Sequence, residues 1–228
     1  MIPVPEPLQP GSTIGLLGGG QLAQMLVLSG HAMGFRFIAL DPNPNCPAAL
    51  VGAEQITASY TDSEALAKLA DSSQVVTYEF ENVDAEAVAW LEERVDLPQG
   101  SELLLISQNR LREKTCLEQL NIPVAPFQEI KNENEVSQAF EVLGILMMKT
   151  VTGGYDGRGQ VLISDKEQIP EAFSVLSKAK TEIIAEQFVQ FEKEVSVIVA
   201  RNRLGEISCF PPAENLHKKN TDHQQNTC

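Results

Sequence analysis

A glycine-rich segment in the second half of the chain has the residue types of a polyphosphate-binding loop. Residues 152–159 read Thr-Gly-Gly-Tyr-Asp-Gly-Arg-Gly, and Lys149 precedes them. The four glycines leave backbone N–H groups accessible to an anion, and Lys149 and Arg158 can neutralise its charge. A hairpin turn needs only about two to four residues, so this length favours a functional loop over a plain turn. No Gly-Lys-Ser/Thr sequence follows, which excludes a Walker loop.

A second glycine-rich turn lies near the N-terminus. Gly18-Gly-Gly20 follows the apolar run 14–17 and opens a helical pattern, and Asp41 ends the next apolar run. Gly18-x-Gly20-x-x-Ala23 with an acidic residue about 20 positions later fits a dinucleotide site formally. The same turn could hold any phosphate at a helix N-terminus, or no ligand at all. Dinucleotide binding is the least favoured of the three, because the chain lacks a dehydrogenase's second half.

A third segment could hold the base and sugar of a nucleotide. Glu186-Gln-Phe-Val189 ends a predicted strand, whose backbone N–H and C=O groups can hydrogen-bond an adenine edge. Glu194 follows a few residues later, and its carboxylate could hold a ribose hydroxyl. Taken alone, the segment fits an edge strand with solvated glutamates better.

The elements that must position these residues fall into two groups. The first part of the chain alternates short apolar runs with helical patterns, which predicts a parallel sheet with right-handed crossovers. Thr61 and Glu64 have the spacing of a capping box, and Asp84 can cap another short helix. The predicted strands are 14–17, 35–40 and 75–78.

The pattern changes after about Gln108. A charged helix over 109–120 is followed by a strand over 124–130, which Pro126 places at a sheet edge. The other predicted elements are helices 135–143 and 170–178 and strands 145–149, 160–163, 182–189, 194–200 and 206–210. Overall the fold class is α/β. We expect a Rossmann-like domain over 1–107, an α+β domain over 108–217 and a loose tail over 218–228.

Composition excludes several other classes of protein. The chain of 228 residues has 17 basic and 31 acidic side chains, a net charge of -14 that argues against nucleic-acid binding. No apolar run is long enough to span a membrane, and residues 1–13 do not resemble a secretory signal. Four scattered cysteines indicate reduced thiols and a cytoplasmic location. A metal site formed by His217, His223 and Cys228 is disfavoured against a loose terminal tail.

Several short motifs, taken together and in order, resemble the 5-(carboxyamino)imidazole ribonucleotide synthases of the ATP-grasp family. The resemblance extends from about Thr13 to His217. The motifs are Gly18-Gly-Gly-Gln-Leu22, Tyr78-Glu-Phe-Glu-Asn82, Gln108-x-Arg110-x-x-Glu113-Lys114, Ile122-Pro-Val-Ala-Pro126, Lys149-Thr-x-Thr-Gly-Gly-Tyr-Asp-Gly-Arg-Gly-Gln160, Glu186-Gln-Phe188 and Ala213-Glu-Asn-x-His217.

The resemblance implies a reaction and a set of site residues. ATP would phosphorylate bicarbonate to carboxyphosphate, which would deliver carbon dioxide to the exocyclic amine of 5-aminoimidazole ribonucleotide, with Mg²⁺ required. The family also implies a homodimer. The expected nucleotide contacts are Arg110, Lys149, Gly154, Tyr155, Asp156, Gly157, Arg158, Gly159, Gln160, Glu186, Gln187, Phe188, Val189, Glu194 and His217. Tyr155, Asp156 and Arg158 would also face the aminoimidazole as catalytic residues, with Gly20, Gln21 and Glu79 or Glu81 on the opposite wall.

The largest departure from the family is at the end of the chain. The family continues past His217 into a part that carries the Mg²⁺ ligands, whereas residues 218–228 contain no large aliphatic side chain. We therefore expect a truncated form with little or no activity of its own, with the metal ligands beyond its end. The alternatives are a nucleotide-binding fragment without turnover, another ATP-grasp ligase of the glycinamide ribonucleotide transformylase or biotin carboxylase type, and an NAD-dependent oxidoreductase.

Overall fold

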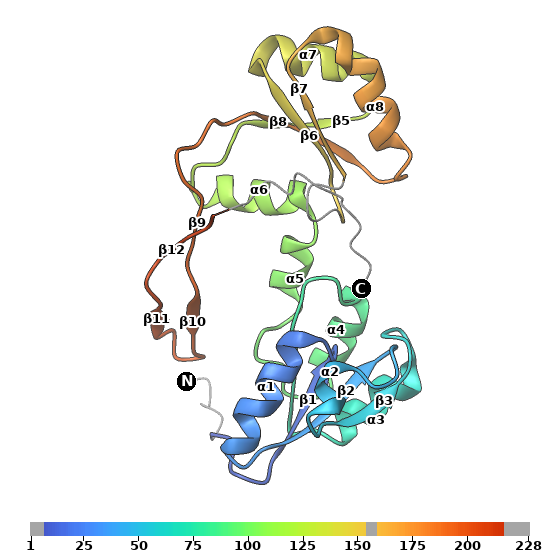
Figure 1. The fold of residues 1–228 in the computed structure, drawn as a ribbon, viewed down its shortest axis with the longest axis vertical. Coiled ribbons are helices and arrows are strands. Elements are labelled where there is room, and N and C mark those ends of the chain that lie inside the picture. Colours follow the sequence, from blue (N-terminus) through green and yellow to red (C-terminus); the bar gives the residue numbers. More distant parts are fainter. Residues whose placement is uncertain (1–6, 154–158, 217–228) are drawn as a thin grey trace, which may run out of the picture. The chain divides into compact units, whose positions relative to one another are not determined.

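A computed structural model describes residues 7–153 and 159–216 of the chain (Figure 1). The first sheet has four parallel strands in the order β3-β2-β1-β4, which confirms the predicted parallel sheet. Its elements are β1 (Thr13–Leu17), α1 (Gln21–Ala32), β2 (Arg36–Asp41), α2 (Pro47–Leu50), β3 (Glu54–Thr57), α3 (Ser63–Asp71), β4 (Val75–Tyr78) and α4 (Ala85–Glu92).

Helices cover both faces of this sheet. Because successive side chains of a strand point to opposite faces, Leu16 and Leu17 of β1 enter different cores. Leu16 packs with Ala23 and Val27 of α1, whereas Leu17 packs in a cluster that contains residues of α3 and α4. Burial on both faces explains why these strands read as continuous apolar runs in the sequence.

The second sheet is antiparallel, with strands in the order β5-β8-β6-β7. The helices α5 (Glu102–Ser107) and α6 (Arg110–Gln119) precede it along the chain. Its own elements are β5 (Phe127–Ile130), α7 (Glu133–Leu143), β6 (Leu146–Thr150), β7 (Gln160–Ile163), the 3-10 turn η1 (Lys166–Gln168), α8 (Ile169–Ser177) and β8 (Ile183–Gln187). The prediction that the Pro126 strand lies at an edge is confirmed, since β5 is an outer strand.

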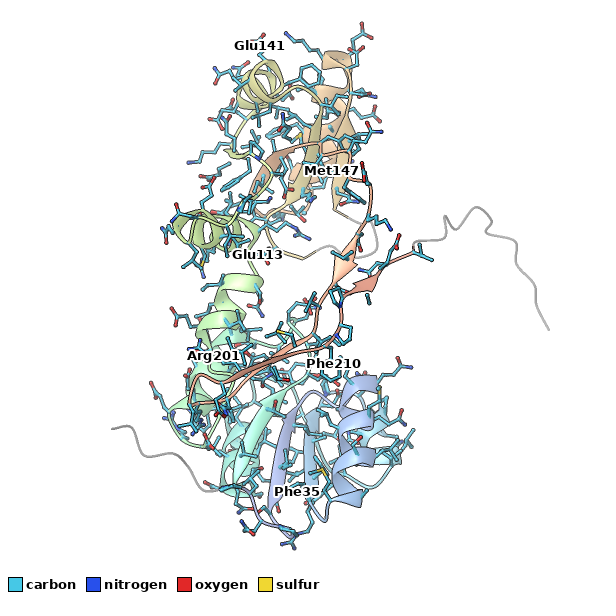
Figure 2. The ribbon with its side chains drawn as sticks, turned by 90° about the vertical axis from the view of Figure 1, so that its left-hand side faces the viewer. Phe35, Glu113, Glu141, Met147, Arg201 and Phe210 are labelled. Carbon is cyan, nitrogen blue, oxygen red and sulfur yellow. The ribbon has the colours of Figure 1, made fainter. Side chains whose placement is uncertain are left out.

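One face of the second sheet carries the core, and the other carries the polar site residues. Leu146 and Met148 of β6 pack with Ala139 of α7 and Leu176 of α8. Because side chains alternate between the two faces along a strand, Met147 and Lys149 lie on the face opposite this core. Met147 is labelled in Figure 2.

Residues 189–216 belong to a unit separate from the described residues up to Phe188. It contains two antiparallel pairs, β9 (Val195–Ser196) with β12 (Ala213–Glu214) and β10 (Val199–Arg201) with β11 (Ile207–Cys209). The large apolar side chains of this unit are exposed, including Phe210 (Figure 2).

Several predicted elements have different bounds in the structure. The expected strand 194–200 is two short strands, β9 and β10, which pair with different partners. The cap of α3 is Asp62 rather than Thr61, because the Asp62 carboxylate accepts hydrogen bonds from the Glu64 and Ala65 amides. Asp84 caps α4 as predicted. The tail 218–228 lies outside the described residues.

Candidate nucleotide-binding site

The ends of the glycine-rich loop are held by two paired strands. Lys149 on β6 is opposite Gln160 on β7, and the Thr150 amide donates a 2.9 Å hydrogen bond to the Gly159 carbonyl. Six predicted site residues lie outside the described residues. They are His217 and the loop residues Gly154, Tyr155, Asp156, Gly157 and Arg158. The described flanks of the loop therefore belong to or adjoin the paired strands β6 and β7, and Lys149 lies on β6.

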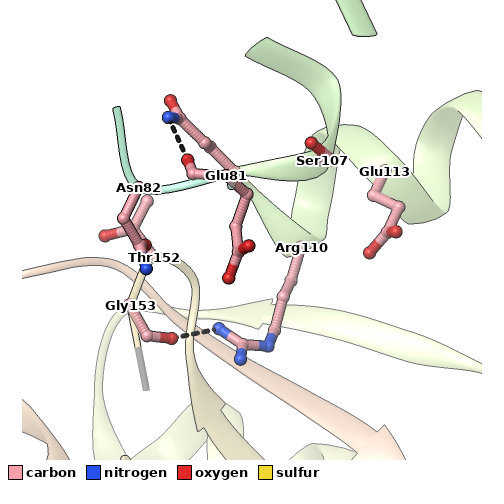
Figure 3. Close-up of a pocket in the computed structure, with 8 residues that line it drawn as sticks. Glu81, Asn82, Ser107, Arg110, Glu113, Thr152 and Gly153 are labelled. Atoms are coloured by element: carbon pink, nitrogen blue, oxygen red, sulfur yellow. Dashed lines mark hydrogen bonds between the residues drawn. The ribbon is translucent and has the colours of Figure 1, made fainter. Parts of the chain in front are cut away.

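Arg110 is joined to the beginning of this loop. Its Nη1 donates a 2.8 Å hydrogen bond to the carbonyl of Thr150 and a 2.7 Å hydrogen bond to that of Gly153. Figure 3 shows the bond to Gly153. The Arg110 amide also donates to the carbonyl of Val151 at 3.0 Å. One arginine at the start of α6 thus holds the backbone on the N-terminal side of the loop, so its charge lies where the loop begins.

Lys149 shares a buried carboxylate with a second lysine. The Nζ of Lys149 lies 3.0 Å from Glu186 Oε2, and the Nζ of Lys114 lies 3.4 Å from the same oxygen. The Glu186 side chain is only 9% exposed, while those of Lys114 and Lys149 are 14% and 25% exposed. Glu186 is the penultimate residue of β8, so the sheet brings a predicted phosphate ligand next to a predicted adenine-binding strand.

A cavity of about 310 Å³ lies between the loop after β4 and the helix α6 (Figure 3). Gln108 donates from Nε2 to the carbonyls of Glu81, at 2.5 Å, and Val83, at 2.7 Å, and so joins the two sides of the cavity. The carboxylate of Glu81 is among the groups at the cavity, which is lined by Glu81, Asn82, Ser107, Gln108, Arg110, Glu113, Thr152 and Gly153.

Carboxylates of the chain itself occupy the N-terminal glycine turn. Asp41 Oδ2 accepts a 2.9 Å hydrogen bond from the Gly19 amide. Glu79 accepts one of 2.7 Å from the Gly20 amide through Oε1 and another from the Ala23 amide through Oε2. These are the donors that a phosphate at the start of α1 would use. Of the three interpretations of this turn, the arrangement favours a tight turn whose donors are satisfied internally.

Asp41 is also unavailable to a ribose in this arrangement. It is 6% exposed, and its Oδ2 accepts a 3.0 Å hydrogen bond from the Tyr60 hydroxyl. Burial, together with the adjacent Asp41 charge, raises the pKa of Tyr60 well above its usual range. Asp41 therefore acts here as a structural acceptor for the turn and for Tyr60.

The predicted adenine-binding residues divide between the two units of the chain. Glu186, Gln187 and Phe188 belong to the first unit, where the Phe188 amide donates to the Ile145 carbonyl at 2.8 Å. Val189 and Glu194 belong to the second. There the Glu194 side chain accepts a 3.1 Å hydrogen bond from Asn215 Nδ2.

Sequence reasoning assigned no role to Lys114, Gln108 or Glu113. Lys114 and Arg110 are four residues apart in α6 and share one face of that helix. The four-residue spacing of Arg110 and Lys114 in the Gln108–Lys114 motif could have indicated that the two side chains lie close together.

Comparisons with known proteins agree with this arrangement. Residues 11–108 match the ribonucleotide synthetase pre-ATP-grasp domain, and residues 115–227 match the ATP-grasp domain. The chain belongs to the ATP-grasp family. It is 45% identical over 214 residues to the N5-carboxyaminoimidazole ribonucleotide synthase of Bacillus subtilis, a match that covers 93% of this chain and 56% of that protein.

Solved structures of such synthetases share the fold. An N5-carboxyaminoimidazole ribonucleotide synthetase in complex with ADP is 46% identical with a TM-score of 0.87, covering 93% of this chain and 56% of the other. The Aspergillus clavatus enzyme, solved with ADP and 5-aminoimidazole ribonucleotide, is 29% identical with a TM-score of 0.83, covering 92% and 55%. The chain thus spans about half the length of the relatives that it matches.

Among the residues that the structure describes, no helix is long and apolar enough to cross a membrane. Within the same residues, no group of three or more His, Cys, Asp and Glu side chains could hold a metal ion.

Proposed function

We propose that this chain supplies the nucleotide-binding part of an ATP-dependent carboxylase that converts 5-aminoimidazole ribonucleotide to 5-(carboxyamino)imidazole ribonucleotide in purine biosynthesis. The observation that carries the proposal is the position of Lys149. Its ammonium lies at the base of the glycine-rich loop and beside Glu186 at the end of β8. Relatives that share the fold and 46% and 29% sequence identity were solved with ADP and with ADP plus the aminoimidazole ribonucleotide, respectively, which supports both ligands.

The proposed reaction has two steps. A bicarbonate oxygen attacks the γ-phosphorus of ATP, which releases ADP and forms carboxyphosphate. Carboxyphosphate then yields carbon dioxide and phosphate, and the exocyclic amine attacks the carbon to form the new C–N bond and lose a proton. Phosphoryl transfer depends mainly on positioning and charge neutralisation, and carboxyphosphate must be kept from water.

The residues of this chain have distinct parts in the proposal. Lys149 and Arg110 neutralise the phosphates, and the loop that they flank closes over them. The nucleotide contacts extend to Gly159 and Gln160, to residues 186–189 for adenine, to Glu194 for ribose and to His217. The loop residues Tyr155, Asp156 and Arg158 face the aminoimidazole, with Gly20, Gln21 and Glu79 or Glu81 opposite.

The described residues gather no set of three acidic, histidine or cysteine side chains, and the proposal places the Mg²⁺ ligands in the part of the family that follows His217. The proposal also includes a homodimer, as the family implies, and a cytoplasmic location with reduced thiols. The proposed domain boundary lies near residue 107.

Calorimetric titration of the purified chain with ATP tests the nucleotide site. Lys149→Met should weaken ATP binding by about tenfold or more, because it removes a cation from the phosphates. Lys131→Met is the matched control, since Lys131 contacts Glu129 at the surface and should leave binding unchanged. Absence of ATP binding by the unaltered chain would refute the proposal.

Turnover requires a second experiment. A chimera can join residues 1–216 of this chain to the remaining part of the Bacillus subtilis relative. It should release ADP only when bicarbonate and 5-aminoimidazole ribonucleotide are both present. ADP release that is indifferent to the ribonucleotide would favour another ATP-grasp ligase.

A further inference from the structure

Two ammonium groups share one buried carboxylate in the candidate site. Lys114 and Lys149 both contact Oε2 of Glu186, at 3.4 Å and 3.0 Å. A single negative charge cannot neutralise both, so the cluster carries an excess positive charge. The proposed function uses this charge through Lys149 and leaves Lys114 without a role.

The fold holds Lys114 close to Glu186. Lys114 lies one helical turn after Arg110 in α6, and its Nζ is 5.6 Å from the centroid of the Phe127 ring. Phe127 on β5 is the cross-strand partner of Glu186 on β8, so the ring and the carboxylate lie side by side on the sheet. Lys114 is therefore placed by both a charged and an aromatic partner.

Once a nucleotide is present, the Lys149 ammonium can contact either Glu186 or the nucleotide phosphates. A polyphosphate at the glycine-rich loop would attract this ammonium away from Glu186. A carboxylate with 9% exposure is poorly solvated, and leaving it without any cation would be costly. Lys114 has the less exposed ammonium side chain of the two and can remain with Glu186.

We propose that Lys114 is a positioning residue that acts as the permanent counter-ion of Glu186 and thereby frees Lys149 to neutralise the nucleotide phosphates. This inference rests on the proposed function, in which Lys149 contacts the phosphates of ATP. It makes the affinity for phosphates depend on a lysine that contacts no phosphate.

The test compares ATP with adenosine, which has no phosphate to attract Lys149. Calorimetry on the 228-residue chain should show that Lys114→Met weakens ATP binding about ten- to hundredfold. Adenosine binding should change by less than about twofold. Lys114→Arg should restore most of the ATP affinity, because it keeps the positive charge.

A double substitution separates the counter-ion role from a structural one. In a Glu186→Gln background, Lys114→Met should have little further effect on ATP binding, since no carboxylate remains to be neutralised. The double variant removes both charges of the Lys114–Glu186 pair and so leaves no buried carboxylate unpaired. ATP binding can therefore still be compared with that of Glu186→Gln if Lys114→Met alone fails to fold.

The outcomes distinguish this inference from the proposed function. Equal weakening of ATP and adenosine binding by Lys114→Met, or no weakening of either, would overturn the counter-ion role alone. An unaltered chain that binds ATP no better than adenosine would overturn the proposed function and this inference with it.

Discussion

The carboxylate of Glu79 and the amide of Gly20 are joined by a 2.7 Å hydrogen bond across 59 positions of sequence. Glu79 follows β4, whereas Gly20 precedes α1, so this bond ties neighbouring parallel strands together at their carboxyl ends. The second oxygen of Glu79 accepts from the Ala23 amide in the first turn of α1. The N-cap residue of α1 is Gly20, which has no side chain to accept from the first amides of the helix, and Glu79 supplies the acceptor instead.

We expect replacement of Glu79 to destabilise the N-terminal domain. Glu79→Ala leaves the Gly20 and Ala23 amides without their acceptor and should lower the free energy of unfolding by about 1–3 kcal/mol. Glu79→Gln keeps one acceptor oxygen and should cost less. Urea denaturation followed by circular dichroism measures both effects.

Glu81→Gln is the matched control for this experiment. Glu81 lies on the same loop with an exposed side chain, so its substitution should change stability by less than about 0.5 kcal/mol. Equal stability of Glu79→Ala and Glu81→Gln would contradict the capping role.

Tyr60 should make stability decline at alkaline pH. Its pKa is raised above the ordinary value of 10.0 mainly by burial and then by Asp41. Above about pH 10 the unfolded phenol loses its proton while the folded phenol retains it. The folded state then binds more protons, so its stability falls as pH rises through this range.

Tyr60→Phe tests this pH dependence. The variant should be less stable by about 1–3 kcal/mol at pH 8, because buried Asp41 loses a donor. The difference from the unaltered chain should shrink as pH increases past 10. Thermal or urea unfolding at several pH values gives the two curves, and parallel curves would count against the assignment.

Gly19 should not tolerate even a methyl group. An alanine Cβ at this position would lie 3.0 Å from Cys46 Cβ and 3.3 Å from Asp41 Cβ, and would also collide with Cys46 Sγ. Since Cys46 is 1% exposed, its surroundings leave little room to move. Gly19→Ala should therefore cost about 1–3 kcal/mol of unfolding free energy.

A double-mutant cycle shows whether the collision with Cys46 is the cause. Cys46→Ala removes the sulfur, so Gly19→Ala should cost less in that background than in the unaltered chain. Additive effects of the two substitutions in urea denaturation would point to another cause.

Ser73 has a buried hydroxyl whose Oγ finds no hydrogen-bond partner among residues 7–153 and 159–216. Ser73→Ala removes an unsatisfied polar group, so we expect unchanged or increased stability, by up to about 1 kcal/mol. Ser101→Ala is the contrasting control, because the Ser101 hydroxyl donates to Glu92 at 2.5 Å. Thermal unfolding should place Ser101→Ala below the unaltered chain and Ser73→Ala at or above it, and a destabilised Ser73→Ala would contradict the prediction.

Local signals in the sequence were sufficient for many elements. The strands 75–78 and 160–163 match β4 and β7, and Asp84 caps α4 as expected. Each depends on residues within a few positions of one another. The strand β3 and the helix α5 were missed. In β3 only Ile56 is buried, so its four residues carry almost no periodic signal, and pairing with β2 defines the strand.

The sequence by itself determined the residue types of the site and the strands around its loop, because strand and loop propensities are local properties. Only the tertiary structure decided which charges meet. Glu186 lies 72 positions after Lys114 and 37 after Lys149, as the residue numbers show. No local pattern specifies a pairing at such separations, since it depends on how α6 packs against the sheet. The same reason explains how Glu79, 59 positions away, comes to accept a hydrogen bond from the Gly20 amide of the N-terminal turn.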